Sequence, residues 1–95
     1  MSFQSPVHDE PLVGKAAYAE LIHRSLEMVR PVAFTVHHVA VHGDLVLAEW
    51  QAEIEWRADG RRSVWRGTSV CEIHGGLITD WREYWNPADF ERRET

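Results

Sequence analysis

The chain has 95 residues, 44% hydrophobic and 26% charged, a composition typical of one globular domain over residues 1–95. Its net charge of −5 argues against a nucleic-acid or anionic-membrane partner, since both require a basic face. The single cysteine, Cys71, excludes an internal disulfide, and no apolar run reaches about 18 residues. We therefore expect a cytoplasmic protein without membrane contact.

The N-terminal third predicts one amphipathic helix after a short extended segment. Residues 1–6 are compatible with a strand, and residues 8–14 have the composition of a loop. Over residues 15–29 apolar side chains recur at helical spacing, and Pro31 prevents continuation of the helix. The apolar positions are Ala17, Tyr18, Leu21, Ile22, Leu26 and Val29.

The rest of the chain predicts four strands joined by three tight turns. The turn signals are Gly43-Asp44, Asp59-Gly60 and Gly75-Gly76. The strands between them span roughly residues 32–42, 45–57, 62–74 and 77–86. Because consecutive strands joined by hairpins are antiparallel, the predicted class is α+β: a curved antiparallel sheet of four to five strands packed on one helix.

Two-residue turns fix a register that assigns side chains to the two faces of the sheet. The first turn places Thr35 opposite Ala52, and the second places Ala52 opposite Gly67. These small side chains, framed by Trp50 and Trp65 on the concave face, leave room for a small hydrophobic ligand. The alternative is that the helix fills this space. The candidate ligand-binding residues on these strands are Thr35, Trp50, Ala52, Trp65, Gly67 and Ser69.

The outer face of the same sheet mixes charged and apolar side chains. Glu53 lies opposite Arg66, and His38 lies opposite Glu49 as a surface pair. Six apolar or aromatic side chains lie among them: Val32, Phe34, Val36, Val64, Val70 and Tyr84. An apolar patch rimmed by charge is typical of an interface, so we expect a homodimer through this face.

The last strand, residues 77–86, carries the strongest chemical signal. Glu83 is flanked at i±2 by Trp81 and Trp85, so all three share one face of an extended chain. With aromatic neighbours and no counter-charge, burial should raise the pKa of Glu83, and both tryptophans become candidate ligand contacts. An arginine reaching in, such as Arg30, would instead lower that pKa and make Glu83 structural.

A β-bulge is required to bring this trio to the concave face. Strict alternation from the third turn would point Asp80 and Arg82 inward and both tryptophans into solvent. Exposing two tryptophans in order to bury two charges is the costlier arrangement. We therefore predict one extra residue between Ile78 and Trp81, near Thr79-Asp80.

The run over residues 81–85, which follows a Gly-x-Ile turn, resembles the last strand of limonene epoxide hydrolases and related SnoaL-like proteins. These belong to the NTF2-like superfamily of cone-shaped α+β barrels, in which the acid of this run is the catalytic base. The matching residues are Trp81, Arg82, Glu83, Tyr84 and Trp85, with Glu for the usual Asp. The resemblance covers nearly the whole chain. It implies a truncated cone, since about two further helices usually precede the first strand.

The other catalytic positions of the epoxide hydrolases differ here. Their first-strand Tyr and Asn correspond to Phe3 and Ser5, and their third-strand Arg-x-Asp pair corresponds to Trp50 and Ala52. Only Glu83 matches in type, which argues against epoxide hydrolysis by that mechanism. Two functions stay open: a non-catalytic module that binds a small hydrophobic molecule, and an isomerase, cyclase or hydrolase with Glu83 as general base.

One histidine is a second catalytic candidate. The predicted register points His37 to the concave face, either as a core histidine or as an acid–base partner for Glu83. The six histidines include no HxxxH pair on a helix, so we expect no metal, and no pattern calls for a cofactor. Cys71 also points inward, where it acts as a small hydrophobic side chain.

Overall fold

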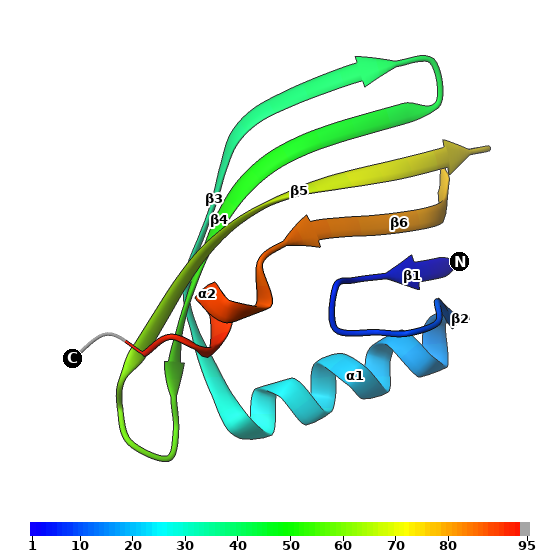
Figure 1. The fold of residues 1–95 in the computed structure, drawn as a ribbon. Coiled ribbons are helices and arrows are strands. Elements are labelled where there is room, and N and C mark those ends of the chain that lie inside the picture. The colour runs from blue at the N-terminus through cyan, green and yellow to red at the C-terminus, as the bar shows by residue number, and fades with distance from the viewer. Residues whose placement is uncertain (94–95) are drawn as a thin grey trace.

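The computed structural model describes residues 1–93, and its four long strands bend together into a strongly curved, unclosed sheet with a helix across the concave side (Figure 1). The elements are β1 (Ser2–Gln4), β2 (Leu12–Val13), α1 (Lys15–Met28), β3 (Val29–His42), β4 (Leu45–Trp56), β5 (Arg62–His74), β6 (Leu77–Trp85) and α2 (Pro87–Glu91). Strand order is β2-β1-β6-β5-β4-β3, so the first two strands extend the four predicted hairpin strands into a six-stranded sheet. The α+β class is confirmed. Within residues 1–93, every helix is too short or too polar to span a bilayer.

Helix α1 passes into β3 without a loop. The helix ends at Met28 and the strand begins at Val29, so both boundaries differ from the predicted residues 15–29 and 32–42. Pro31 therefore lies within a strand, where its missing N–H is tolerated because β3 is an edge strand with an irregular register at this point. The buried side chain of Val29 anchors the junction.

The register between β4 and β5 is shifted by two residues from the predicted one. Ala52 lies opposite Trp65, two positions before the predicted Gly67, because the connection after Trp56 is longer than a two-residue turn. Since side chains alternate with a period of two, an even shift changes the partners but keeps every side chain on its face. Trp50, Ala52 and Ile54 are accordingly buried on the concave side.

A bulge at His37 overturns the predicted orientation of β3. Val36 pairs with Trp50 and His38 pairs with Glu49, so His37 has no partner on β4. This odd shift exchanges the faces of residues 33–36, up to a second irregularity between Pro31 and Ala33. Phe34 therefore joins the concave side, where its ring lies 5.5 Å from that of Trp50.

The exchange corrects three sequence-based expectations. Thr35 pairs with Gln51 and is exposed on the outer face, so its predicted place in the pocket is wrong. His37 is exposed at the bulge and does not point into the core. The outer apolar patch loses Phe34 and Val36, although association of two copies through the remaining patch stays a prediction.

The bulge predicted in the last strand is confirmed. Ile73 pairs with Ile78, whereas Glu72 pairs with Asp80, so Thr79 is the extra residue. The Thr79 hydroxyl donates a hydrogen bond to the Glu72 carbonyl at 3.3 Å. Trp81, Glu83 and Trp85 therefore point to the concave face, as predicted.

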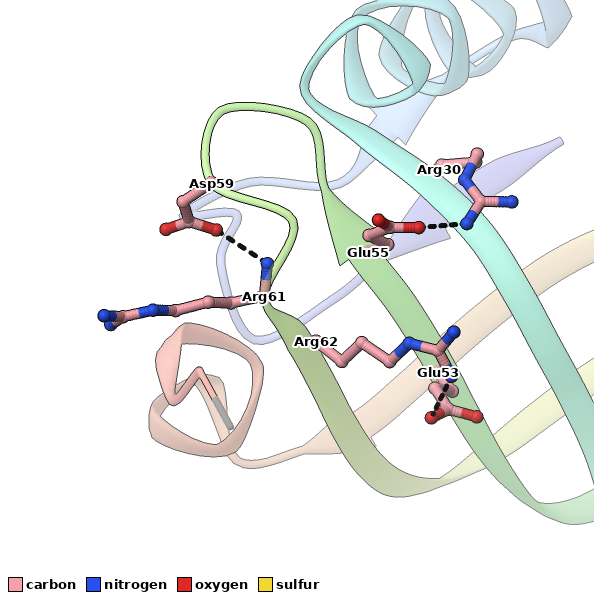
Figure 2. A network of polar contacts seen from close by, with 6 residues as sticks. All are labelled: Arg30, Glu53, Glu55, Asp59, Arg61 and Arg62. Atoms are coloured by element: carbon pink, nitrogen blue, oxygen red, sulfur yellow. Dashed lines mark hydrogen bonds and ion pairs between the residues drawn. The ribbon is translucent and has the colours of Figure 1, made fainter. Parts of the chain in front are cut away.

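Ion pairs on the outer face tie β3, β4 and β5 together (Figure 2). Arg30 pairs with Glu55, and Arg62 lies 3.4 Å from Glu53. Glu53 thus pairs with Arg62 and not with the predicted Arg66. Arg66 donates a hydrogen bond to Gln51. Exposed pairs of this kind add little stability, although His38 does pair with Glu49 as predicted, at 2.9 Å.

Candidate functional site

Glu83 lies on the concave face of β6 between two indole groups that each hold one carboxylate oxygen. The N–H of Trp81 donates to Oε2 at 3.1 Å, and that of Trp85 donates to Oε1 at 3.2 Å. Burial raises the pKa of Glu83, and the two indole hydrogen bonds and the nearby His8 offset this only in part. Desolvation therefore outweighs the compensating contacts, as predicted, whereas the two indole hydrogen bonds that hold the carboxylate were not predicted from the sequence.

The arginines that could have neutralised Glu83 are engaged elsewhere. Arg82 points to the outer face, where it pairs with Asp80 and lies 3.2 Å from Glu72. Arg30 pairs with Glu55 on the far side of the sheet. The alternative in which an arginine lowers the pKa of Glu83 is therefore wrong.

Glu83 lines two cavities on the concave side of the sheet, of about 400 and 460 Å³. The larger hollow, about 460 Å³, lies between α1 and the sheet and includes Phe3 and Tyr18 in its lining. The smaller, about 400 Å³, lies along β3 and β4 and includes Phe34. Both hollows share four lining residues: Ile54, Trp65, Glu83 and Trp85. Helix α1 therefore does not fill the concave face.

Aromatic side chains close the cavity where it meets the C-terminal helix α2. Asn86 caps α2 by accepting from the N–H of Ala88, and Pro87 begins the helix. The helix directs Phe90 onto Trp65, with ring centroids 4.9 Å apart and nearly perpendicular. Helix α2, which the sequence pattern did not predict, thus supplies part of the pocket wall.

The predicted ligand-binding residues divide into wall and support. Trp50, Ala52, Trp65 and Trp85 line the hollows, and their contact with a ligand stays a prediction. Three others support these walls: Gly67, Ser69 and Trp81.

The supporting residues are covered by the walls. A Cβ on Gly67 would lie 2.7 Å from the Trp50 ring, so only glycine lets the indole lie flat there. Ser69, paired with Glu83 across β5 and β6, accepts the Trp50 N–H at 2.8 Å and is only 2% exposed. Cys71 is buried opposite Trp81, and burial raises the pKa of its thiol. These side chains set the position of the wall and leave ligand contact to others.

Three polar side chains near Glu83 were not identified from the sequence as site residues. Strand β1 runs parallel to β6, with Phe3 opposite Trp81, and this brings Ser5 and His8 to the cavity. Tyr18 reaches the same cavity from α1, and its pKa is raised by burial and then by the charge of Glu83. His37, by contrast, is not brought to the site.

A hydrogen bond of 2.6 Å joins Ser5 Oγ to His8 Nδ1. Together with Glu83, the cavity thus contains a desolvated carboxylate and an imidazole held in a fixed orientation, which are groups suited to proton transfer. Within residues 1–93, no three His, Cys, Asp or Glu side chains are grouped so as to hold a metal ion.

The chain is similar to known proteins both in sequence and in structure. A model of the SnoaL-like domain matches residues 1–81. An NTF2-like protein from Burkholderia thailandensis is 14% identical with a TM-score of 0.83, over 96% of this chain and 73% of its own. A candidate isomerase from Bacillus subtilis is 27% identical with a TM-score of 0.80, over 95% of this chain and 72% of its own.

A third similar structure is an LEH-like epoxide hydrolase from M. tuberculosis. It is 23% identical with a TM-score of 0.76, over 96% of this chain and 66% of its own. This chain therefore spans 66 to 73% of the length of the three proteins. No curated protein matches the chain.

Proposed function

Because the chain belongs to the SnoaL-like domain family, we propose that it binds a small apolar molecule beside Glu83 and uses this carboxylate as a general base. Members of this family are often isomerases, cyclases or hydrolases. The observation that carries the proposal is the environment of Glu83: two indole N–H donors, aromatic walls and, among residues 1–93, no arginine or lysine paired with it. A carboxylate desolvated in this way takes up a proton more readily than one in water.

The aromatic walls favour proton abstraction over epoxide opening. Trp50 and Ala52 stand where the resemblance to epoxide hydrolases requires an Arg-x-Asp pair, and both belong to the apolar wall. Such a wall excludes water from the carboxylate, which strengthens its interaction with a substrate proton. We therefore propose an isomerase-like or cyclase-like proton transfer.

A generic proton-abstraction probe tests this proposal without knowledge of the natural substrate. In nitrobenzisoxazole, removal of the ring C–H proton breaks the N–O bond and releases a coloured cyanonitrophenolate. The protein should accelerate this reaction well beyond acetate at the same concentration and pH. Glu83→Gln should lower the rate by about a hundredfold or more, the size of a lost general base.

The matched control is Glu72→Gln, which removes a carboxylate from the outer face of the sheet and should leave the rate unchanged. Unchanged turnover in Glu83→Gln, or a wild-type rate no higher than that of acetate, contradicts the general-base proposal. Binding of a neutral apolar dye such as Nile red, without turnover of the probe, would instead favour a binding module of the same fold.

A further inference from the structure

We propose that His8 is a second catalytic residue, which supplies a proton to a substrate oxygen while Glu83 removes one from carbon, and that Ser5 is its positioning residue. This inference rests on the proposed function of Glu83. It adds the acid half of a proton transfer, a role that the sequence pattern predicts for His37.

The backbone around His8 is fixed by local contacts. The His8 N–H donates to the Ser5 carbonyl at 3.2 Å, and the side-chain amide of Gln4 donates to the His8 carbonyl at 2.9 Å. The ring of Phe3 meets the imidazole edge-to-face at 5.9 Å. These contacts close a tight turn directly after β1, so His8 is held by the same strand that pairs with β6.

Ser5 fixes the orientation of the ring. Its Oγ lies 2.6 Å from Nδ1, and the residue is only 4% exposed. Whichever way the hydroxyl proton points, Nδ1 is engaged, and Nε2 is the ring nitrogen left to serve a ligand. The burial of Ser5 also argues against a nucleophilic serine, because a substrate carbonyl would have to reach its oxygen.

His8 faces the cavity from the turn after β1, and Glu83 faces it from β6. Both line the hollow of about 460 Å³, together with Tyr18. The hydrogen bonds of Glu83 go to two indoles and that of the His8 ring goes to Ser5. A substrate between them would therefore meet a base on one side and an imidazole on the other without breaking any of these bonds.

The step balances in protons and electrons. Glu83 takes the proton from a substrate carbon, the electron pair of that C–H bond moves through the substrate to an oxygen, and protonated His8 donates its Nε2 proton to that oxygen. The carboxyl and the neutral imidazole then return to their starting states by giving up and regaining a proton. No oxidant or reductant is needed, and the ligand is an apolar molecule with an oxygen conjugated to the reacting carbon.

Two probes that differ only in their leaving group test this role. Nitrobenzisoxazole releases a stable phenolate that needs little protonation, whereas unsubstituted benzisoxazole releases a more basic phenolate that gains from an acid. His8→Gln should slow the nitro compound by no more than about threefold and the unsubstituted compound by about ten- to a hundredfold. Ser5→Ala should change the ratio in the same direction but less, because the histidine stays while its orientation loosens.

Two further variants make the result specific. His38→Gln removes a histidine from the outer face, where it pairs with Glu49, and should leave both rates unchanged. Tyr18→Phe removes the phenolic hydroxyl of the cavity, so a selective loss for unsubstituted benzisoxazole in that variant alone would assign the acid to Tyr18 and overturn the proposal. Equal slowing of both probes in His8→Gln also overturns it, because it indicates a purely structural histidine. If Glu83→Gln keeps full activity, the general-base proposal for Glu83 is wrong, whatever the result for His8.

Discussion

The two faces of β6 carry carboxylates with opposite surroundings. Asp80 points outward and shares Arg82 with Glu72, so its charge is balanced by a neighbour in contact with water. Glu83 points inward and receives two neutral indole donors, and no arginine or lysine of the described part of the chain pairs with it. Residue type is nearly the same on the two faces. The partners and the solvent decide which carboxylate is suited to chemistry, and one inserted residue decides which face each occupies.

Deleting Thr79 would remove that inserted residue and should have the largest effect. The register would then turn Trp81, Glu83 and Trp85 toward solvent and Asp80 and Arg82 into the core. The cost is comparable to the whole stability of a small domain, about 5–15 kcal/mol, so we expect no folded protein. Circular dichroism and thermal unfolding measure this.

Thr79→Ala serves as the control for the deletion, because it keeps the extra residue and loses only the 3.3 Å hydrogen bond to Glu72. It should fold and unfold close to the wild type, within about 1 kcal/mol. A stable, cooperative deletion variant would show that the bulge does not determine the orientation of the strand.

Glu83→Gln should remove the effect of pH on stability that comes from the inner face. The pKa of Glu83 is raised by burial in the folded state, so its contribution to stability is complete below the unfolded pKa and is lost as pH rises through the folded pKa. The glutamine variant cannot ionise. Its free energy of unfolding relative to wild type should therefore increase with pH, as measured by urea unfolding at several pH values. If the free energy of unfolding of the variant instead falls relative to wild type as pH rises, the desolvation of Glu83 is contradicted.

Trp85→Phe should move the pH dependence of the reaction. The variant keeps an aromatic wall but removes the N–H that stabilises the ionised carboxylate at 3.2 Å, so the pKa of Glu83 should rise further. The pH at half-maximal rate with nitrobenzisoxazole should shift upward. Trp65→Phe is the matched control, because the buried Trp65 N–H has no hydrogen-bond partner among the described residues. Equal shifts in both variants would show that wall packing, not the hydrogen bond, sets the pKa.

Arg82→Gln should have the smallest effect, because it changes only the outer face. It removes ion pairs to Asp80 and Glu72 that are partly exposed and screened by water. We expect a loss of less than about 1 kcal/mol in the free energy of unfolding and no change in the rate with either probe. A large loss of activity would show that charge on the outer face reaches Glu83.

The sequence predicted the orientation of β6 because the two registers differ greatly in cost. One buries two tryptophans and the other buries Asp80 and Arg82, so the bulge at Thr79 follows from burial alone. On β3 the turn at Gly43-Asp44 predicts a register that the structure does not keep beyond His37. The apolar pair Phe34 and Val36 was a stronger guide to the buried face than that turn, because a bulge can absorb one residue.

The site residues that could not be predicted from the sequence lie on segments that no hairpin connects to β6. β1 pairs with β6 in parallel from the other end of the chain, and no turn connects the two strands. Ser5 and His8 therefore reach the cavity through a long-range contact with no local signal. Tyr18 was predicted on the apolar side of the helix, so its packing could be read from periodicity, whereas its proximity to Glu83 could not.

The titration of the Glu83 carboxyl tests the central claim most directly. Carbon-detected NMR of protein labelled at the glutamate side-chain carboxyl carbons follows each group with pH, and the spectrum of Glu83→Gln identifies the Glu83 signal by its absence. We predict that this carboxyl, whose pKa is raised by burial, titrates at higher pH than Glu55 on the outer face, whose pKa is lowered by its hydrogen bond to Arg30. A Glu83 signal that titrates with or below that of Glu55 would contradict the account.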